Sequence, residues 1–335
     1  MTSNIGIDRV GATDAAPDTD RRPRRRSIAD RERAAQRFLI ATVDERFDAD
    51  LDIDWSATPS KTAAWLPEHL VSVSGTRLWE RMPAPKRAEL ARRELVNLLT
   101  LCVFANTSQS MLEFRRIGED QTLADDTARW GFATINIRTT NTAMFGRLIT
   151  VTGLPPHPHP RLAWLLERYT LLIPAGAMTA SIYLMAESCT RALVTTLAAD
   201  RSVQPHVRQV AALHERSTRR LSDFARLDFE ASMDRKGPLR TFFYSVVSGL
   251  VLRMVARTLI APEAYRETGL MVRRSQWAAR RSNRRGARLD LFFAEYLDLA
   301  KAHGLFGDAL SRRLVRIVPA ASRRPETVLP GSVDR

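Results

Sequence analysis

The stretch LHERSTRRLSDFAR, residues 213–226, carries the pattern on which the fold prediction rests. His214, Thr218 and Leu221 follow one another at spacings of four and three residues, which places their side chains on one face of an α-helix. Most of the positions between them are charged or polar, as is typical of a helix face that meets solvent. We therefore expect a helix over residues 205–232 that points this stripe into the protein interior.

The rest of the chain repeats this helical pattern. Of its 335 residues, 44% are hydrophobic and 26% charged, which is ordinary for a globular protein, and only 15 are glycine and 17 proline. The other predicted helices span residues 27–48, 86–116, 123–150, 161–201, 238–259 and 287–303. The clearest breaks are GLPPHPHPR at 153–161 and DRSVQP at 200–205. We predict an all-α protein with one helical-bundle domain over 31–318, a disordered tail over 1–30 and a flexible tail over 319–335.

A net charge of +14 raises the question of a nucleic-acid partner, but only four of the 51 basic residues are lysines. The densest block, RRSQWAARRSNRRGAR at 273–288, places seven arginines around Trp277. We interpret it as a solvated, partly disordered loop. The alternative, an arginine-rich nucleic-acid-binding protein, would show strongly salt-dependent binding.

Cysteine usage and hydropathy favour a cytoplasmic protein. Cys102 and Cys189 lie in apolar helical patterns and are expected to be buried free thiols. The first 27 residues lack the apolar segment of a signal peptide. Residues 169–186 carry no charge, but they contain Pro174 and Gly176, so we expect a buried bundle helix; the second apolar run, 241–252, is too short to span a bilayer and ends at Arg253. No membrane association is predicted.

Several common site types are absent from the sequence. It contains no glycine-rich phosphate loop, no Gly-x-Ser-x-Gly turn and no Cys-x-x-Cys pair. The six histidines are scattered, and His157 and His159, in the proline-rich loop, are interpreted as surface residues.

Three longer stretches resemble one known family. They are residues 52–94 (DIDWSATPSKTAAWLPEHLVSVSGTRLWERMPAPKRAELARRE), 141–155 (NTAMFGRLITVTGLP) and 186–226 (AESCTRALVTTLAADRSVQPHVRQVAALHERSTRRLSDFAR). They resemble the p-aminobenzoate N-oxygenase-like di-iron oxygenases, which oxidise aromatic amines at a pair of irons held by carboxylates and histidines. The resemblance spans residues 45–315. It implies a ferritin-like bundle of the di-iron-oxygenase type and a homodimer.

The same resemblance implies seven metal-site positions, and this chain retains two of the ligands. The seven positions are Ala105, Arg138, Asn141, Glu187, His214, Thr218 and Leu221. Glu187 and His214 keep the family residue type. Arg138 and Asn141 stand where the family has the Glu and His of Asp-Glu-x-x-His, and Thr218 and Leu221 replace a second Glu and His. Ala105, in a helix segment without a carboxylate, aligns with the first Glu.

These substitutions predict a metal-free site. A pair of irons carries at least four positive charges and needs several oxygen and imidazole ligands, whereas Arg138 brings a permanent positive charge. We hypothesise that Arg138 fills the space of the metal and pairs with a buried Glu187, with His214 in the same hydrogen-bond network. A buried cation without such a partner would be too costly to retain.

The leading functional hypothesis is a pseudo-oxygenase without iron, which either binds a small aromatic ligand or pairs with an active paralogue in a heterodimer. Iron is expected only if this alignment is wrong. One alternative is an oxidoreductase of aromatic amines with a single metal on Glu187 and His214, completed by Glu94, Glu113 or Asp223. Another is metal-free catalysis with His214 as a base beside Ser217.

Overall fold

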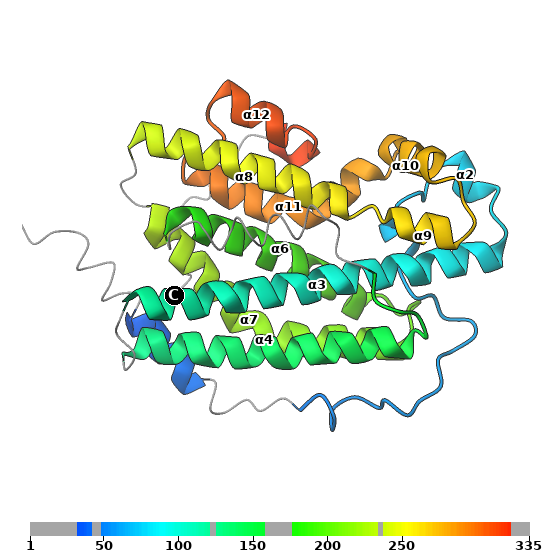
Figure 1. Ribbon diagram of the computed structural model, residues 1–335, viewed down its shortest axis with the longest axis horizontal. Coiled ribbons are helices and arrows are strands. Elements are labelled where there is room, and N and C mark those ends of the chain that lie inside the picture. The colour runs from blue at the N-terminus through cyan, green and yellow to red at the C-terminus, as the bar shows by residue number, and fades with distance from the viewer. Residues whose placement is uncertain (1–31, 42–47, 121–124, 158–175, 234–236, 323–335) are drawn as a thin grey trace, which may run out of the picture.

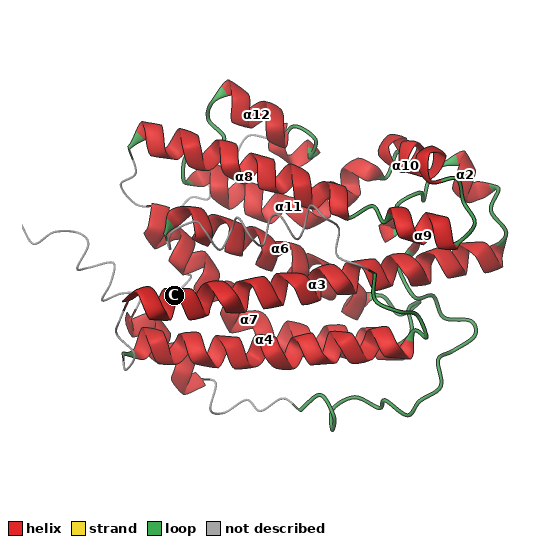
Figure 2. Ribbon diagram, in the orientation of Figure 1, coloured by secondary structure: helices red, strands yellow, loops and turns green. Residues whose placement is uncertain are grey.

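The structure, a computed structural model, describes residues 32–41, 48–120, 125–157, 176–233 and 237–322. Within these ranges it contains helices and no strand, apart from one isolated bridge between Ala64 and Val203 (Figure 2). The all-α prediction is confirmed. The predicted tail over 1–30 lies outside the described residues.

Four long helices form the bundle that positions the site. They are α3 (Ala84–Asp120), α4 (Asp126–Val151), α6 (Ala177–Ala199) and α7 (Pro205–Met233). The helix pairs α3/α4 and α6/α7 pack closely along their lengths, and contacts of α4 with α7 and of α3 with α6 close the bundle (Figure 1). Four helices in this arrangement enclose an interior to which each contributes one face.

A second layer covers α6 on the side away from α4. It consists of α8 (Pro238–Thr258) and α11 (Arg285–Ala302), with α12 (Ala309–Val315) and a 3-10 helix, η2 (Pro319–Ser322), outside them. Short elements gather at one end of the molecule: η1 (Glu68–Leu70), α2 (Arg77–Glu80), α9 (Pro262–Glu267) and α10 (Val272–Arg281) (Figure 1). The helical residues 32–41 pack on the bundle through Phe38, whose ring lies 5.4 Å from that of Trp130.

Local sequence explains where the bundle helices begin. The Asp125 carboxylate accepts the Ala128 N–H at 2.7 Å and so caps the first turn of α4. Pro205 starts α7, where its missing N–H costs nothing. Just before it, the buried Gln204 side chain bonds the backbone of Ser60 and Ala63 and ties the loop before η1 to the bundle.

The structure corrects several predicted boundaries. The predicted helix over 161–201 appears as α6, and residues 158–175 lie outside the described part of the chain. The block 273–288 is not a disordered loop, because it forms α10 and the start of α11 and buries Ser275 and Ala279. The tail predicted from 319 begins too early, because η2 is folded and its Ala320 is buried. His157 is 8% exposed and bonds the Arg93 carbonyl, so it is not a surface residue.

Two helical segments in the described residues are long and apolar enough to cross a membrane by length and composition, Ala84–Glu119 and Pro238–Glu267. The second contains the apolar run 241–252 and extends beyond it on both sides, so by length the prediction that this run is too short to span a bilayer was wrong. The most apolar window of Ala84–Glu119 is 56% buried, as expected for a core helix, and that of Pro238–Glu267 is 39% buried. Length and composition alone are weak evidence for a membrane span.

Candidate functional site

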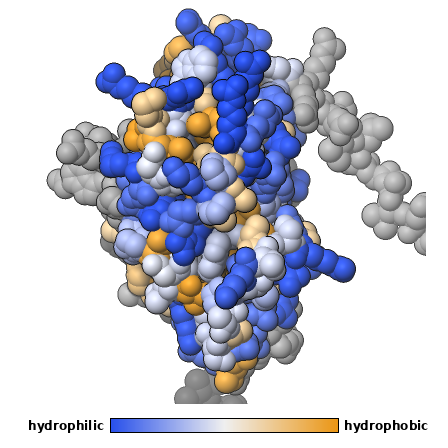
Figure 3. All heavy atoms as spheres, turned by 90° about the vertical axis from the view of Figure 1, so that its right-hand side faces the viewer, coloured by the Kyte–Doolittle hydropathy of each residue, from blue (hydrophilic) through white to orange (hydrophobic). Residues whose placement is uncertain are grey.

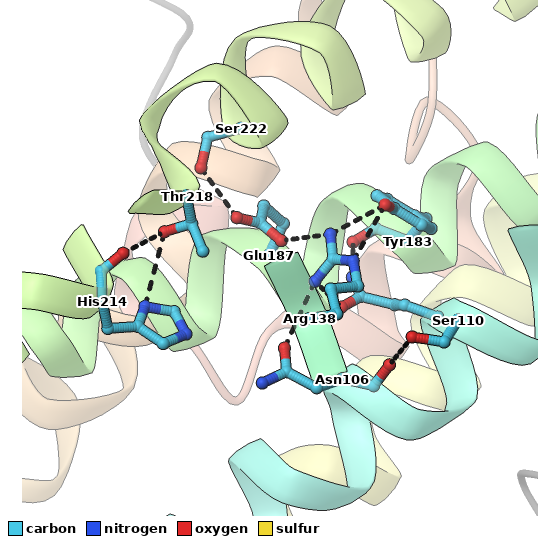
Figure 4. Close-up of polar contacts among 9 residues, drawn as sticks. Asn106, Ser110, Arg138, Tyr183, Glu187, His214, Thr218 and Ser222 are labelled. Carbon is cyan, nitrogen blue, oxygen red and sulfur yellow. Dashed lines mark hydrogen bonds and ion pairs between the residues drawn. The ribbon is translucent and has the colours of Figure 1, made fainter. Parts of the chain in front are cut away.

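A buried ion pair lies at the centre of the bundle. Arg138 on α4 is 1% exposed and Glu187 on α6 is 3% exposed, and the Arg138 Nη2 donates to Glu187 Oε2 at 2.9 Å (Figure 4). The second carboxylate oxygen of Glu187 accepts the hydroxyl of Ser222 from α7 at 2.8 Å. The predicted pairing of Arg138 with Glu187 is confirmed, and it joins three of the four bundle helices.

The remaining donors of Arg138 are also used. Its Nη2 and Nε donate to the Tyr183 hydroxyl at 2.7 and 3.2 Å. Its Nη1 donates to the side-chain oxygens of Gln109 and Asn106 on α3, at 2.6 and 3.3 Å. The guanidinium therefore donates five hydrogen bonds to four side chains. This uses all five of its N–H groups.

The electrostatics of the pair keep both partners charged. Burial alone would raise the pKa of Glu187, but the Arg138 charge and hydrogen bond, with the Ser222 hydroxyl, lower it below its ordinary value. Burial likewise acts to lower the pKa of Arg138, and Tyr183 and Glu187 outweigh it and raise that pKa. Arg138 and Glu187 thus compensate each other's charge inside the bundle.

His214 lies beside this pair but is not bonded to it. Its ring stacks on Phe145 with centroids 4.8 Å apart, and its Nδ1 lies 3.4 Å from the Thr218 hydroxyl (Figure 4). Burial, together with the charge of Arg138, lowers the pKa of His214 to about 4 against the opposing effect of Glu187. The imidazole is therefore neutral at pH 7, and the prediction that it joins the Arg138 hydrogen bonds was wrong.

The other substituted positions are occupied by locally satisfied or apolar side chains. Thr218 donates its hydroxyl to the His214 carbonyl at 2.8 Å, within α7. Leu221 belongs to a small apolar cluster with Trp130 and Phe224. Asn141 accepts the Ser217 hydroxyl at 3.2 Å. These side chains offer a metal no carboxylate and no imidazole.

Three buried polar atoms near Arg138 have no hydrogen-bond partner among the described residues: Asn106 Nδ2, Asn141 Nδ2 and His214 Nε2. In Figure 4 the amide of Asn106 and the ring of His214 extend toward each other from opposite sides. Unsatisfied buried polar groups cost roughly 1–3 kcal/mol each, and a buried water with three partners is the usual remedy. These three groups make the interior beside the ion pair polar without adding a charge to it.

Ala105 lines an apolar cavity of about 140 Å³ between α3, α6, α8 and α11. Cys102, Cys189 and Phe292 line it, and so do Gln109 and Tyr183, which bond Arg138. Both cysteines are free; Cys102 is buried and Cys189 half-buried. On α3 the residues that reach the ion pair are Asn106 and Gln109, so the alignment of Ala105 with the first metal ligand places that ligand on the cavity side.

The carboxylates considered for a single metal do not gather around His214. Glu94 precedes Ala105 by eleven residues on α3, which is about 16 Å of helix. Its carboxylate accepts the backbone N–H of Ser72. Asp223 is exposed. The Glu113 carboxylate packs against Gly131, where an added Cβ would lie 2.9 Å from its Oε1. The proposed base does not activate Ser217 either, because the two acceptors within reach of the Ser217 hydroxyl are the His214 backbone carbonyl at 3.0 Å and Asn141 Oδ1 at 3.2 Å, not the His214 ring.

Comparison with known proteins agrees with this architecture. The family model described as p-aminobenzoate N-oxygenase AurF matches residues 28–304, most of the chain. The chain belongs to the AurF family. This family has a ferritin-like di-iron helical fold, which confirms the predicted fold class. No curated protein matches the chain.

Among the described residues of this AurF-family chain, the donor set does not fit a di-iron centre. Within the described residues, no group of three or more His, Cys, Asp or Glu side chains is placed to hold a metal ion. Of the two remaining ligand candidates, Glu187 uses both carboxylate oxygens to accept hydrogen bonds from Arg138 and Ser222. The other candidate, His214, has one unpartnered ring nitrogen, Nε2. One free imidazole nitrogen is too few for either iron.

Sequence reasoning missed four residues of this network: Asn106, Gln109, Tyr183 and Ser222. Helical spacing contained a signal for each. Asn106 and Gln109 are a polar i, i+3 pair in an apolar stretch of α3, and Tyr183 precedes Glu187 by one turn on α6. Ser222 continues the stripe of His214 and Thr218 by another turn. Polar residues on an otherwise buried face mark such networks.

Proposed function

We propose that this chain is an AurF-family protein without iron, a pseudo-oxygenase that binds a small neutral aromatic ligand in the cavity beside Arg138. The observation that carries the first part is the buried Arg138–Glu187 pair, which occupies the interior that the alignment assigns to the metals. The second part rests on the cavity, which adjoins the same hydrogen-bond network.

Electrostatics supports the loss of iron. A guanidinium is not deprotonated in proteins, so Arg138 would repel a di-iron pair at close range whatever the local pH. Moving Arg138 out of the way would leave its five hydrogen bonds to four side chains unmade. The network therefore disfavours metal entry both by charge and by the cost of rearranging it.

The cavity supports an aromatic ligand. Its volume of about 140 Å³ is close to that of an engineered apolar cavity, about 150 Å³, that binds benzene. Its walls are mostly apolar, and Tyr183 is one of the lining residues. The Tyr183 hydroxyl accepts two N–H groups from Arg138, which do not use its own hydrogen. A neutral amine such as aniline suits this lining better than the charged 4-aminobenzoate anion.

The metal content of the purified protein tests the first part. The protein is expressed with added iron and manganese, purified without chelator and analysed by plasma mass spectrometry. We expect far less than one metal per chain. Two irons per chain would mean that this is an oxygenase and that the alignment of Arg138 is wrong, and one stoichiometric metal would favour a mononuclear enzyme.

Calorimetric titration with aniline and 4-aminobenzoate tests the second part. Wild-type protein should bind aniline, Ala105→Phe should fill the cavity and abolish binding, and Thr107→Phe, on the exposed side of α3, should bind like wild type. Equal binding by both variants would exclude this cavity as the site.

A role as a structural or regulatory subunit of an active AurF-type oxygenase, and a homodimeric or heterodimeric state, are proposals that rest on the family. Light scattering after size-exclusion chromatography, alone and with an active paralogue, tests them. If the chain binds no aromatic probe but forms a defined complex with the active enzyme, the subunit role replaces the ligand-binding role. A cytoplasmic location remains a proposal that rests on the two free thiols.

A further inference from the structure

A hollow surrounded by arginines lies about where α8 ends and α11 begins, outside the bundle interior. Its volume is about 380 Å³. Four arginines line it, two from α8, one from α10 and one from the first residue of α11: Arg253, Arg257, Arg280 and Arg285. We call this the arginine hollow.

Among the residues that the structure describes, the arginine hollow is lined by no negatively charged side chain. Its other lining residues include Gln276, Ile260 and Ile317, and no aspartate or glutamate. None of the four arginines has an ion pair or side-chain hydrogen bond within the described residues. This contrasts with Arg138 and with many surface arginines here, such as Arg226, which pair with carboxylates.

Two neighbouring arginines of the hollow disfavour the charge of Arg285. Arg285 is half-buried, and burial, followed by the charges of Arg280 and Arg253, lowers its pKa below the ordinary arginine value. Arg285 also stands at the positive end of the α11 dipole, where a cation is unfavourable. Each of these effects disfavours the charged form of Arg285 in the protein without ligand. A bound anion would offset them.

Arginine clusters of this kind recognise phosphoryl groups. The guanidinium fork matches phosphate oxygens with two parallel hydrogen bonds, and several arginines converge where a multiply charged group is held. The side chain of Gln276 adds a neutral donor and acceptor, and Ile260 and Ile317 provide an apolar wall for an organic part. The end of the molecule formed by α2, α9 and α10 is mostly hydrophilic (Figure 3), which gives a charged ligand a hydrated approach.

We propose that the arginine hollow binds a small phosphorylated organic molecule. This site is independent of the bundle interior, and it gives a role to the arginine-rich block 273–288, which the proposed function leaves unused. The limited volume of the hollow, about 380 Å³, and its apolar wall favour a small molecule over a nucleic-acid backbone, which needs an extended basic surface.

Thermal unfolding of the full chain tests this site, with pyrophosphate and phenyl phosphate as probes in a phosphate-free buffer of low ionic strength. Both probes should raise the melting temperature more than sodium chloride at equal ionic strength. Arg280→Gln and Arg285→Gln should each weaken binding about tenfold, because each removes a charge-assisted pair of hydrogen bonds. Arg273→Gln, at an exposed position of the same α10 outside the hollow, is the matched control and should bind like wild type.

The melting temperatures of the variants without added anion give a second, independent test. Arg285→Gln should melt at a higher temperature than wild type in the absence of anion, because it relieves the repulsion, whereas Arg273→Gln should not. Equal responses of Arg273→Gln and Arg285→Gln to the probes would overturn the proposal. So would binding restricted to a duplex oligonucleotide with a steep salt dependence, which would identify a nucleic-acid surface instead.

Discussion

Replacing Arg138 with methionine tests the central feature of the bundle. The substitution preserves much of the side-chain volume but removes the charge and all five hydrogen bonds to Asn106, Gln109, Tyr183 and Glu187. Glu187, 3% exposed, would keep only the Ser222 hydroxyl as a donor. Breaking a buried ion pair from one side costs roughly 3–5 kcal/mol, because the remaining charge is stranded in the interior.

Thermal unfolding by calorimetry measures this cost. In a domain of this size, 1 kcal/mol shifts the melting temperature by about 2 °C, so a drop of about 6–10 °C is expected for Arg138→Met. The double variant Arg138→Met with Glu187→Met should recover much of that loss, because it removes both charges. Arg138→Lys keeps the charge but not the planar fork and should fall between wild type and Arg138→Met.

The pH dependence separates stranded charge from lost packing. In wild type the pKa of Glu187 is lowered, so its contribution to stability is present above the ordinary glutamate pKa and is lost as pH falls through the lowered value. In Arg138→Met burial dominates and raises that pKa, so the carboxylate takes up a proton as pH falls. The gap in melting temperature between wild type and variant should therefore narrow from pH 8 to pH 5. An unchanged melting temperature, or a gap that does not depend on pH, would refute the reasoning.

Two further predictions concern other buried groups. Burial raises the pKa of Glu94 to about 7, against its hydrogen bonds from Ser72 and the charge of Arg288. Because the folded pKa exceeds the unfolded one, this carboxyl contributes stability below about pH 4.5 that is lost as pH rises to about 7. A rise in pKa from 4.5 to about 7 corresponds to roughly 3 kcal/mol. Glu94→Gln should therefore melt at a higher temperature than wild type at pH 8, by the equivalent of that free energy, and the two should converge at pH 4.5; a constant difference would contradict this. Burial also raises the pKa of the Cys102 thiol to about 12, and that of Cys189 above its usual range. Neither thiol should react with a disulfide reagent at pH 8 in the native protein, and both should react in denaturant; fast labelling of the native protein would mean that the cavity opens readily.

Much of the fold follows from the sequence, because helical periodicity is a local property. Apolar side chains that recur every three or four residues define a face within a single helix, and the predicted bounds of α7 and α8 differ from those in the structure by one residue or none at either end. The same locality explains the main error. In block 273–288 the small residues Ser275 and Ala279, which α10 buries, do not stand out among the arginines as an apolar stripe.

The sequence by itself singled out Arg138 and Glu187, because the resemblance to the family aligns both with metal-ligand positions. A fixed charge needs a partner wherever it is buried, so their pairing could be anticipated from residue types alone. Only the tertiary structure decided the rest of the network. Asn106, Gln109, Tyr183 and Ser222 come from three helices, and whether the first three reach the Arg138 guanidinium and Ser222 reaches the Glu187 carboxylate depends on helix register to within about 0.5 Å. Long-range packing sets that register, and it likewise brings Arg253 and Arg285 together from separate helices.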